Sequence, residues 1–160
     1  MNPGQIVLGF DPGWAKPIAW AISDGEKCHE VGILPPGKNL EFGHVYQTFE
    51  NAKYFSRVQA VYIETGHPGN TVVMEQMALV AGALRICFVP KIPVFFTKYN
   101  EWTWSFNIRI GTLKTIAQPM YLNIAKYYKP DLLELGHNKV LTGDIAAAIC
   151  ISIFGSRRLG

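Results

Sequence analysis

Three short apolar runs, separated by turn signals, open the chain and constrain its fold more than any other feature. They cover residues 5–10, 18–23 and 27–34, and each has the length of a β-strand. Pro12-Gly13 interrupts the first pair, and Asp24-Gly25 is a dipeptide typical of the tight turn in a β-hairpin. Consecutive strands joined by such short turns pair antiparallel. We therefore expect an antiparallel meander of three strands at the start of the fold.

Helical and strand patterns alternate in the rest of the chain. The apolar spacing of residues 40–56 is typical of an amphipathic helix, and residues 60–64 form a short β-branched run. This order predicts an α/β fold, with a mixed sheet of about five strands, the first three antiparallel, and helices on both faces. The 160 residues, 49% of them hydrophobic, suit one domain over 1–160. The other expected elements are a helix over 70–89 capped by Asn70 or Thr71, a strand at 94–96, an aromatic-rich loop at 99–110, a helix at 112–128, a loop at 130–138 and a last helix from about 142.

The charge is distributed unevenly between the two halves of the chain. Residues 1–80 carry 5 Lys and Arg against 8 Asp and Glu, whereas residues 81–160 carry 10 against 4. A basic half favours a polyanionic partner such as nucleic acid, although scattered solvated lysines explain the charge equally well. The longest apolar run, residues 77–84, is too short to span a bilayer, so no membrane partner is expected. Three cysteines far apart in the sequence favour a reducing cytoplasm.

Three carboxylates stand at the ends of apolar elements. Asp11 ends the first strand, Glu64 ends the run 60–64, and Asp144 opens the last helix. Each has an ordinary explanation by itself, as a turn cap, as the first residue outside the sheet, or as a helix N-cap. Together they predict an acidic cluster, which stays ionised only if cations neutralise it. Carboxylate oxygens suit Mg²⁺ or Mn²⁺, and two such ions promote phosphodiester hydrolysis.

Five segments in chain order resemble the motifs of RuvC-type Holliday junction resolvases, which have the ribonuclease H-like fold. The resemblance implies a metal-dependent endonuclease that binds branched DNA, the four-way junction, and nicks opposed strands symmetrically as a homodimer, in recombination, repair or phage DNA processing. It also implies the cytoplasm of a bacterial or phage-infected cell. The segments are VLGFDPG (7–13), VYIETGHPGN (61–70), LVAGALR (79–85), IRIGTLK (108–114) and GDIAAAICIS (143–152).

The resemblance assigns roles to individual residues. Asp11, Glu64 and Asp144 match the catalytic ligands of Mg²⁺ or Mn²⁺, with two ions per active site, and Lys114 matches the basic catalytic residue near the scissile phosphate. His67 stands where the family often has an aromatic wedge, and it either stacks on a base or is an ordinary loop histidine. The expected DNA-binding residues are His67, Asn70, Arg85, Lys98, Arg109 and Lys114.

The last helix departs from the family pattern at Ala147, where a second acid would stand one turn after Asp144. Either this branch lacks the acid, or the alignment shifts so that Asp144 is the second acid and Leu141 the first, or Ala147 is an introduced inactivating change, which is the interpretation we favour. A chain with one acid fewer would be catalytically weakened, and would bind junctions without cutting them if Ala147 is native.

Other functions remain open at this stage. An RNA-processing nuclease of the same fold is one alternative. A nucleotide-binding domain of the actin and sugar-kinase type is another, because that group also opens with a strand, an aspartate and a glycine turn. The aromatic segment 102–106 either stacks on unpaired bases or packs in the core, and we favour the core for Trp102 and Trp104.

Overall fold

A mixed five-stranded sheet forms the centre of the molecule in the computed structural model, which describes residues 4–66, 69–108 and 114–159. The strand order is β3-β2-β1-β4-β5. The first three strands pair antiparallel, whereas β4 runs parallel to both β1 and β5. This arrangement confirms the α/β fold with an antiparallel opening. The strands are β1 (Val7–Asp11), β2 (Ile18–Ser23), β3 (Cys28–Leu34), β4 (Ala60–Thr65) and β5 (Val94–Lys98).

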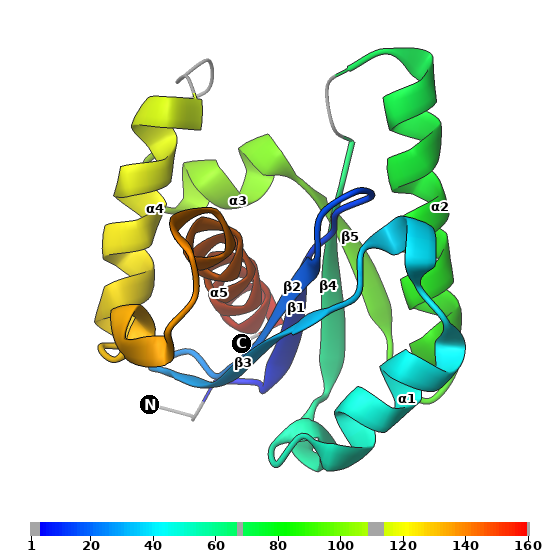
Figure 1. Ribbon diagram of the computed structural model, residues 1–160. Helices are drawn as coiled ribbons and strands as arrows, with labels where there is room; N and C mark the ends of the chain where they lie inside the picture. Colours follow the sequence, from blue (N-terminus) through cyan, green and yellow to red (C-terminus); the bar gives the residue numbers. More distant parts are fainter. Residues whose placement is uncertain (1–3, 67–68, 109–113, 160) are drawn as a thin grey trace.

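Helices cover both faces of this sheet, as Figure 1 shows, with α1 and α2 on one side and α4 and α5 on the other. Short 3₁₀ helices, η1 (Gly37–Asn39), η2 (Phe55–Arg57) and η3 (Leu132–Leu135), lie in the connections. The α-helices are α1 (Phe42–Asn51), α2 (Thr71–Phe88), α3 (Tyr99–Ser105), α4 (Lys114–Tyr128) and α5 (Lys139–Leu159).

Alternation along β1 divides the core into two apolar layers. Val7 packs on the α4 and α5 side, whereas Leu8 and Phe10 pack on the α1 and α2 side. Successive side chains of a strand point to opposite faces, so Asp11 belongs to the α5 side. The same rule places Glu64 on that side, because Tyr62 belongs to the α5 layer.

Helix α5 crosses β1 at Gly9. A Cβ atom at Gly9 would lie 2.6 Å from the backbone nitrogen of Ser152 and 2.8 Å from the backbone oxygen of Ala148. Only glycine permits this close contact between the helix and the strand. The contact therefore fixes the distance between α5 and β1, two residues before Asp11.

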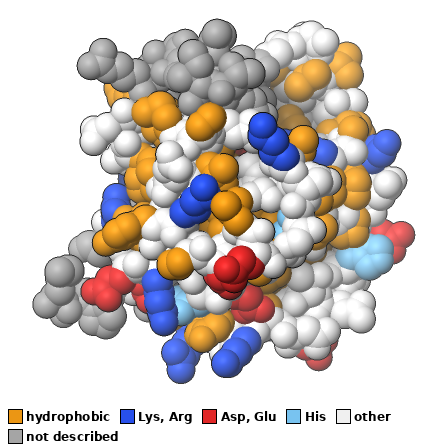
Figure 2. Space-filling view, turned by 60° about the vertical axis from the view of Figure 1, so that its left-hand side comes forward, with side chains coloured by type: hydrophobic (Ala, Val, Ile, Leu, Met, Phe, Trp, Pro, Cys, Tyr) orange, Lys and Arg blue, Asp and Glu red, His pale blue; other side chains and the backbone are white. Residues whose placement is uncertain are grey.

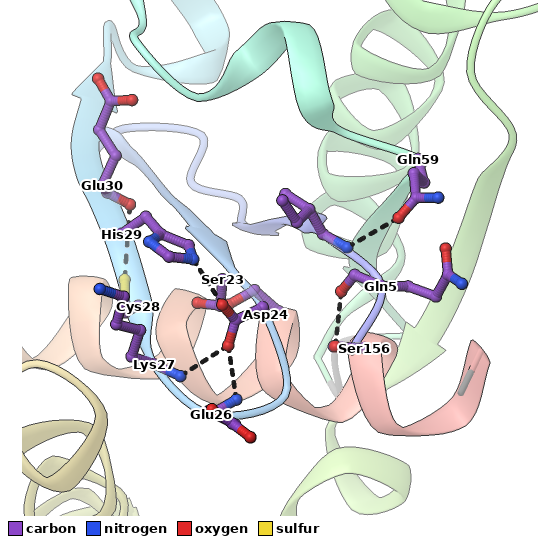
Figure 3. Close-up of polar contacts among 12 residues, drawn as sticks. Gln5, Ser23, Asp24, Glu26, Lys27, Cys28, His29, Glu30, Gln59 and Ser156 are labelled. Atoms are coloured by element: carbon purple, nitrogen blue, oxygen red, sulfur yellow. Dashed lines mark hydrogen bonds and ion pairs between the residues drawn. The ribbon is translucent and has the colours of Figure 1, made fainter. Parts of the chain in front are cut away.

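Polar contacts hold the opposite end of the sheet together (Figure 3). Asp24 Oδ1 accepts the backbone N–H groups of Glu26 at 2.6 Å and Lys27 at 2.9 Å, and Asp24 Oδ2 lies 2.6 Å from His29 Nε2. Burial alone would raise the pKa of Asp24, but these hydrogen bonds outweigh it and lower that pKa. Ser156 of α5 donates to the backbone oxygen of Gln5 at 2.6 Å, which ties the helix to the start of β1.

Three expectations about local structure need correction. The segment expected as an aromatic loop begins with a helix, α3, and the Glu101 side chain accepts the backbone N–H of Lys98 at 3.4 Å at its start. Trp102 is fully buried as expected, but Trp104 is 56% exposed, so its core assignment was wrong. Helix α5 begins at Lys139 rather than 142, because the Asn138 side chain accepts the backbone N–H of Leu141 at 2.9 Å and caps it.

Two described helices, α2 and α5, are long and apolar enough to cross a membrane by length and composition alone. In an 18-residue window, 83% of α5 is buried within the fold, as in a core helix, but only 22% of α2 is buried. Helix α2 therefore carries exposed hydrophobic side chains. Three of them share the side of the helix opposite its buried residues and are called the α2 apolar face below: Val72, Leu79 and Ile86.

Candidate active site

Asp11 and Glu64 lie at the ends of two neighbouring parallel strands. Strand β1 pairs with β4 up to Phe10 and Ile63, so the next residue of each strand is an acid. The two are 7% and 4% exposed, respectively. The strand ends that carry them lie at the upper end of the sheet in Figure 1, where the connection from β1 to β2 turns back. Ends of strands in open α/β sheets are where functional sites are usually built.

Asp144 reaches the same region from helix α5, which packs across β1, β2 and β4. It is 5% exposed, and its Oδ1 accepts a hydrogen bond from Lys16 Nζ at 2.8 Å. Lys16 belongs to the connection between β1 and β2, 128 residues away in sequence. This ion pair therefore joins the connection between β1 and β2 to the last helix.

The electrostatics of Lys16 link all three carboxylates. Burial alone would lower the pKa of Lys16, but Asp11, Asp144 and Glu64 outweigh that effect and raise it. All three acids contribute to this effect, so Asp11, Glu64 and Asp144 lie around one ammonium group and are called the carboxylate cluster below. The lysine was not expected from the sequence.

An aromatic wall borders the cluster. Trp102 contacts Tyr99 and Tyr121 edge to face, with ring centroids 5.4 and 5.5 Å away. Burial raises the pKa of Tyr121, and Asp11, Tyr99, Asp144 and Glu64 raise it further, so both tyrosines stay neutral. The hydroxyl oxygen of Tyr99 is buried and has no hydrogen-bond partner among the described residues. The three rings therefore pack together next to the carboxylates.

The carboxylates provide the kind of ligands that a hard divalent cation prefers. All three are oxygen donors, and the buried Asp144 Oδ2 has no hydrogen-bond partner among the described residues. A lone buried carboxylate oxygen is costly and is satisfied by a cation. In the described part of the chain, no three His, Cys, Asp or Glu side chains stand close enough together to hold a metal ion as they lie. The chemistry of the donors fits Mg²⁺ or Mn²⁺.

The predicted DNA-binding residues that the structure describes lie in different parts of the molecule. Lys98 pairs with Thr65 across the sheet, and its side chain passes Gly66, just beyond Glu64. Asn70 caps α2, because its Oδ1 accepts the backbone N–H of Val73 at 2.9 Å. Arg85 lies 14 residues along α2, about 21 Å from the helix start, so it is not at the carboxylate cluster. Lys114 begins α4, whereas His67 and Arg109 lie outside the described residues.

Lys and Arg side chains of the described residues lie on the face that carries α4. Figure 2 shows them scattered among hydrophobic side chains, with acidic side chains mostly in the lower part of this view.

Ala147 lies one helical turn after Asp144 and is 4% exposed. Residues three apart on a helix share a face, so a carboxylate at this position would face the same side of α5 as Asp144. The buried environment explains why alanine is tolerated there. An acid at Ala147 would require a cation.

Sequence reasoning missed Lys16, Tyr99 and Tyr121. Lys16 had a visible signal, because it is a lone charge in the otherwise uncharged stretch from 12 to 23 that follows Asp11. The tyrosines had none, since aromatic residues on helices usually belong to the core.

Comparison with known proteins identifies the fold. No protein-family model matches the chain, and no curated protein matches it. Among solved structures, Thermus thermophilus RuvC in complex with a Holliday junction substrate superimposes with a TM-score of 0.64 and 15% identity, over 98% of this chain and 96% of that one. Fowlpox virus resolvase, in complex with its substrate Holliday junction DNA, gives a TM-score of 0.62 and 12% identity, over 96% and 98%. The yeast mitochondrial Holliday junction resolvase gives a TM-score of 0.53 and 13% identity, over 97% of this chain and 80% of that one. The chain therefore has the fold of RuvC-type resolvases, as its motifs predicted.

Proposed function

We propose that this protein is a structure-selective endonuclease that binds four-way DNA junctions and hydrolyses phosphodiester bonds with Mg²⁺ or Mn²⁺. The supporting observation is the cluster of Asp11, Glu64 and Asp144, which are all at least 93% buried and are linked through Lys16. The junction as substrate is supported by the Thermus thermophilus and fowlpox virus structures, which are complexes with Holliday junctions.

Each acid has a defined task in this proposal. Asp11, Glu64 and Asp144 would hold the divalent ions, which supply activation of water and stabilisation of the leaving oxygen when bound. Asp11 and Glu64 are carried by adjacent strands and move little relative to each other, whereas Asp144 is positioned by the contact of α5 with Gly9. The rings of Tyr99, Trp102 and Tyr121 would keep bulk water off one side of the cluster, which would strengthen its electrostatics.

The phosphate backbone would be held by cations at the rim of the site. Lys98 lies beside the end of β4 and is exposed, so it is placed to contact a phosphate next to the one cleaved. Lys114 begins the helix that carries Tyr121, and its ammonium is proposed to stabilise the charge that develops on the scissile phosphate.

Symmetric cleavage needs two sites, and the α2 apolar face supplies a surface for a second copy of the chain. Beside it lies a hollow of about 660 Å³, lined by residues that include Met74, Met77 and Phe96. Exposed apolar patches of this kind mark association sites. We propose that two copies pair through α2 and place their active sites on either side of a two-fold axis.

The nuclease proposal is tested with labelled four-way junction, duplex DNA and RNA, in Mg²⁺ and in EDTA, for this chain and for Ala147→Asp. We expect Ala147→Asp to nick the junction at opposed positions in Mg²⁺, and this chain to do so more slowly or only to bind. Adding Asp11→Asn to Ala147→Asp should abolish nicking while junction binding survives, because the fold keeps its shape. Asp131→Asn is the matched control, since Asp131 lies in an exposed connection.

Other outcomes identify the competing functions. Preferential cleavage of RNA would support the RNA-processing alternative. Tight junction binding without nicking by either chain would mean a non-catalytic junction binder. Nicking that persists in the Asp11→Asn background would contradict the assignment of the site itself.

The proposed dimer is tested by sedimentation with Leu79→Glu, which puts a charge on a side chain that is 65% exposed in one copy. We expect a dimer for the unmodified chain and a monomer for Leu79→Glu, which should nick only one strand of the junction in the Ala147→Asp background. Leu133→Glu is the control, because Leu133 is similarly exposed, at 59%, but lies in η3. If the unmodified chain and Leu79→Glu both sediment as monomers, the proposed pairing is refuted.

A further inference from the structure

We propose that Lys16 is a built-in counter-cation of the carboxylate cluster, which a divalent ion displaces from Asp144 when it binds. This inference rests on the proposed function, because it assumes that the cluster holds metal. It adds Lys16 to the residues of the site, and it predicts that Lys16 lowers the affinity of the site for a divalent ion.

The first argument is the place of the ammonium group. Lys16 Nζ lies 2.8 Å from Asp144 Oδ1 and is attracted by Asp11 and Glu64 as well. The Lys16 ammonium therefore lies in the region that a metal ion held by these acids would need. Both cations cannot occupy that region at short distance, because like charges in a partly buried site repel strongly.

The second argument is that Lys16 satisfies only one oxygen of Asp144. Its hydrogen bond goes to Asp144 Oδ1, while the buried Oδ2 of the same carboxylate lacks a partner among the described residues. A divalent ion could contact both oxygens of this carboxylate, so exchange in favour of the metal is reasonable.

The third argument is that the Lys16 side chain can move away from Asp144 into water while its backbone stays in place. Its side chain is 39% exposed, compared with 7% for Asp144, so the ammonium can move into water. The backbone of the connection that carries Lys16 is held in place, since the backbone N–H of Gly37 donates to the Gly13 oxygen at 2.9 Å. A Cβ at Gly13 would lie 2.6 Å from Lys16 Cγ, so this glycine leaves the space through which the lysine stem passes.

A permanent salt bridge is the competing interpretation. In that case Lys16 would stabilise the fold equally with and without metal, and the ion would bind without disturbing it. The two interpretations differ in metal affinity. Removing a competing cation strengthens metal binding, whereas removing a structural bridge leaves it unchanged or weakens it.

The test is calorimetric titration of the protein with Mn²⁺, without DNA, which reads affinity independently of activity. We expect Lys16→Met to bind Mn²⁺ at least about tenfold more tightly than the unmodified chain, which corresponds to about 1.4 kcal/mol. Lys16→Arg keeps the charge and should stay near the unmodified affinity. Lys27→Met removes a charge at the opposite end of the sheet and should also leave the affinity unchanged. An unchanged or weaker affinity for Lys16→Met would overturn the proposal.

Two further variants separate the possible failures. Asp11→Asn should lose Mn²⁺ binding; if it binds like the unmodified chain, the proposed metal site is wrong. If Asp11→Asn loses binding while Lys16→Met shows no gain, only the role of Lys16 is refuted. Should Lys16→Met not fold without metal, Lys16→Gln replaces it, because the amide retains a donor for Asp144 without the charge. The gain in affinity is then expected for Lys16→Gln, and its absence counts equally against the proposal.

Discussion

Substitution of Ala147 by aspartate gives the sharpest test of the site. Ala147 is 4% exposed and lies one turn after Asp144, so the new carboxylate would be buried on the same face of α5. Lys16 is already paired with Asp144, so in the absence of metal the added charge would lack a counter-cation among the residues that the structure describes. Burying an uncompensated charge costs about 3–5 kcal/mol.

That free energy translates into a measurable shift of the melting temperature. For a chain of 160 residues, each kcal/mol shifts the melting temperature by about 2–4 °C. Ala147→Asp should therefore melt about 6–20 °C below the unmodified chain in EDTA. Mg²⁺ at about one hundred times its Kd returns about 2.7 kcal/mol through binding to the folded state. Most of the loss should thus disappear when Mg²⁺ is added.

Scanning calorimetry in EDTA and in Mg²⁺ measures both shifts. Ala146→Asp is the matched control, because Ala146 is fully buried but lies two residues after Asp144, about 160° round the helix from it. It should lose stability equally in the two buffers. If Ala147→Asp also loses the same stability with and without Mg²⁺, the position does not belong to a metal site and the reasoning from helix geometry fails.

Three smaller predictions test the framework around the site. Gly9→Ala should lower the free energy of unfolding in urea by about 1–3 kcal/mol, since its Cβ would clash with α5; an unchanged midpoint would contradict the close crossing. Asp24→Asn should reduce the loss of stability between pH 7 and pH 3. The pKa of Asp24 in the folded protein lies below its usual 3.8, so the ionised carboxylate stabilises the fold above pH 3.8. This stabilisation is lost as the pH falls through the lowered pKa. Urea titrations at both pH values measure this, and identical pH slopes would argue against it. Asn70→Ala should cost about 1 kcal/mol through loss of the α2 cap, without weakening junction binding if capping is its whole role.

Local signals predicted most of the sheet. The Asp24-Gly25 turn and the apolar runs around it place β2 correctly, and the acids at the ends of β1 and β4 come together because parallel neighbours end at the same edge. The α3 helix was missed because its aromatic residues mask a weak helical pattern, although Glu101 three residues after Lys98 was a usable signal for its start.

The rest depended on contacts between distant segments. Lys16 meets Asp144 only because α5 crosses β1 at Gly9, and no local pattern records a contact across 128 residues. Trp104 was assigned to the core from its composition, but α3 turns it outward while Trp102 fills the space between α3 and α4. Tertiary placement decided both cases, as it does for most aromatic residues on short helices.

The crossing of α5 over β1 also has a consequence for biosynthesis. The ribosome makes all five strands before it makes α5, yet α5 supplies Asp144 and much of one layer of the core. A nascent chain that ends before residue 139 exposes an apolar sheet face and has only two of the three acids. At about 5–20 residues per second, this vulnerable interval lasts seconds. The same delay means that a partly translated chain lacks Asp144 and has no complete carboxylate cluster.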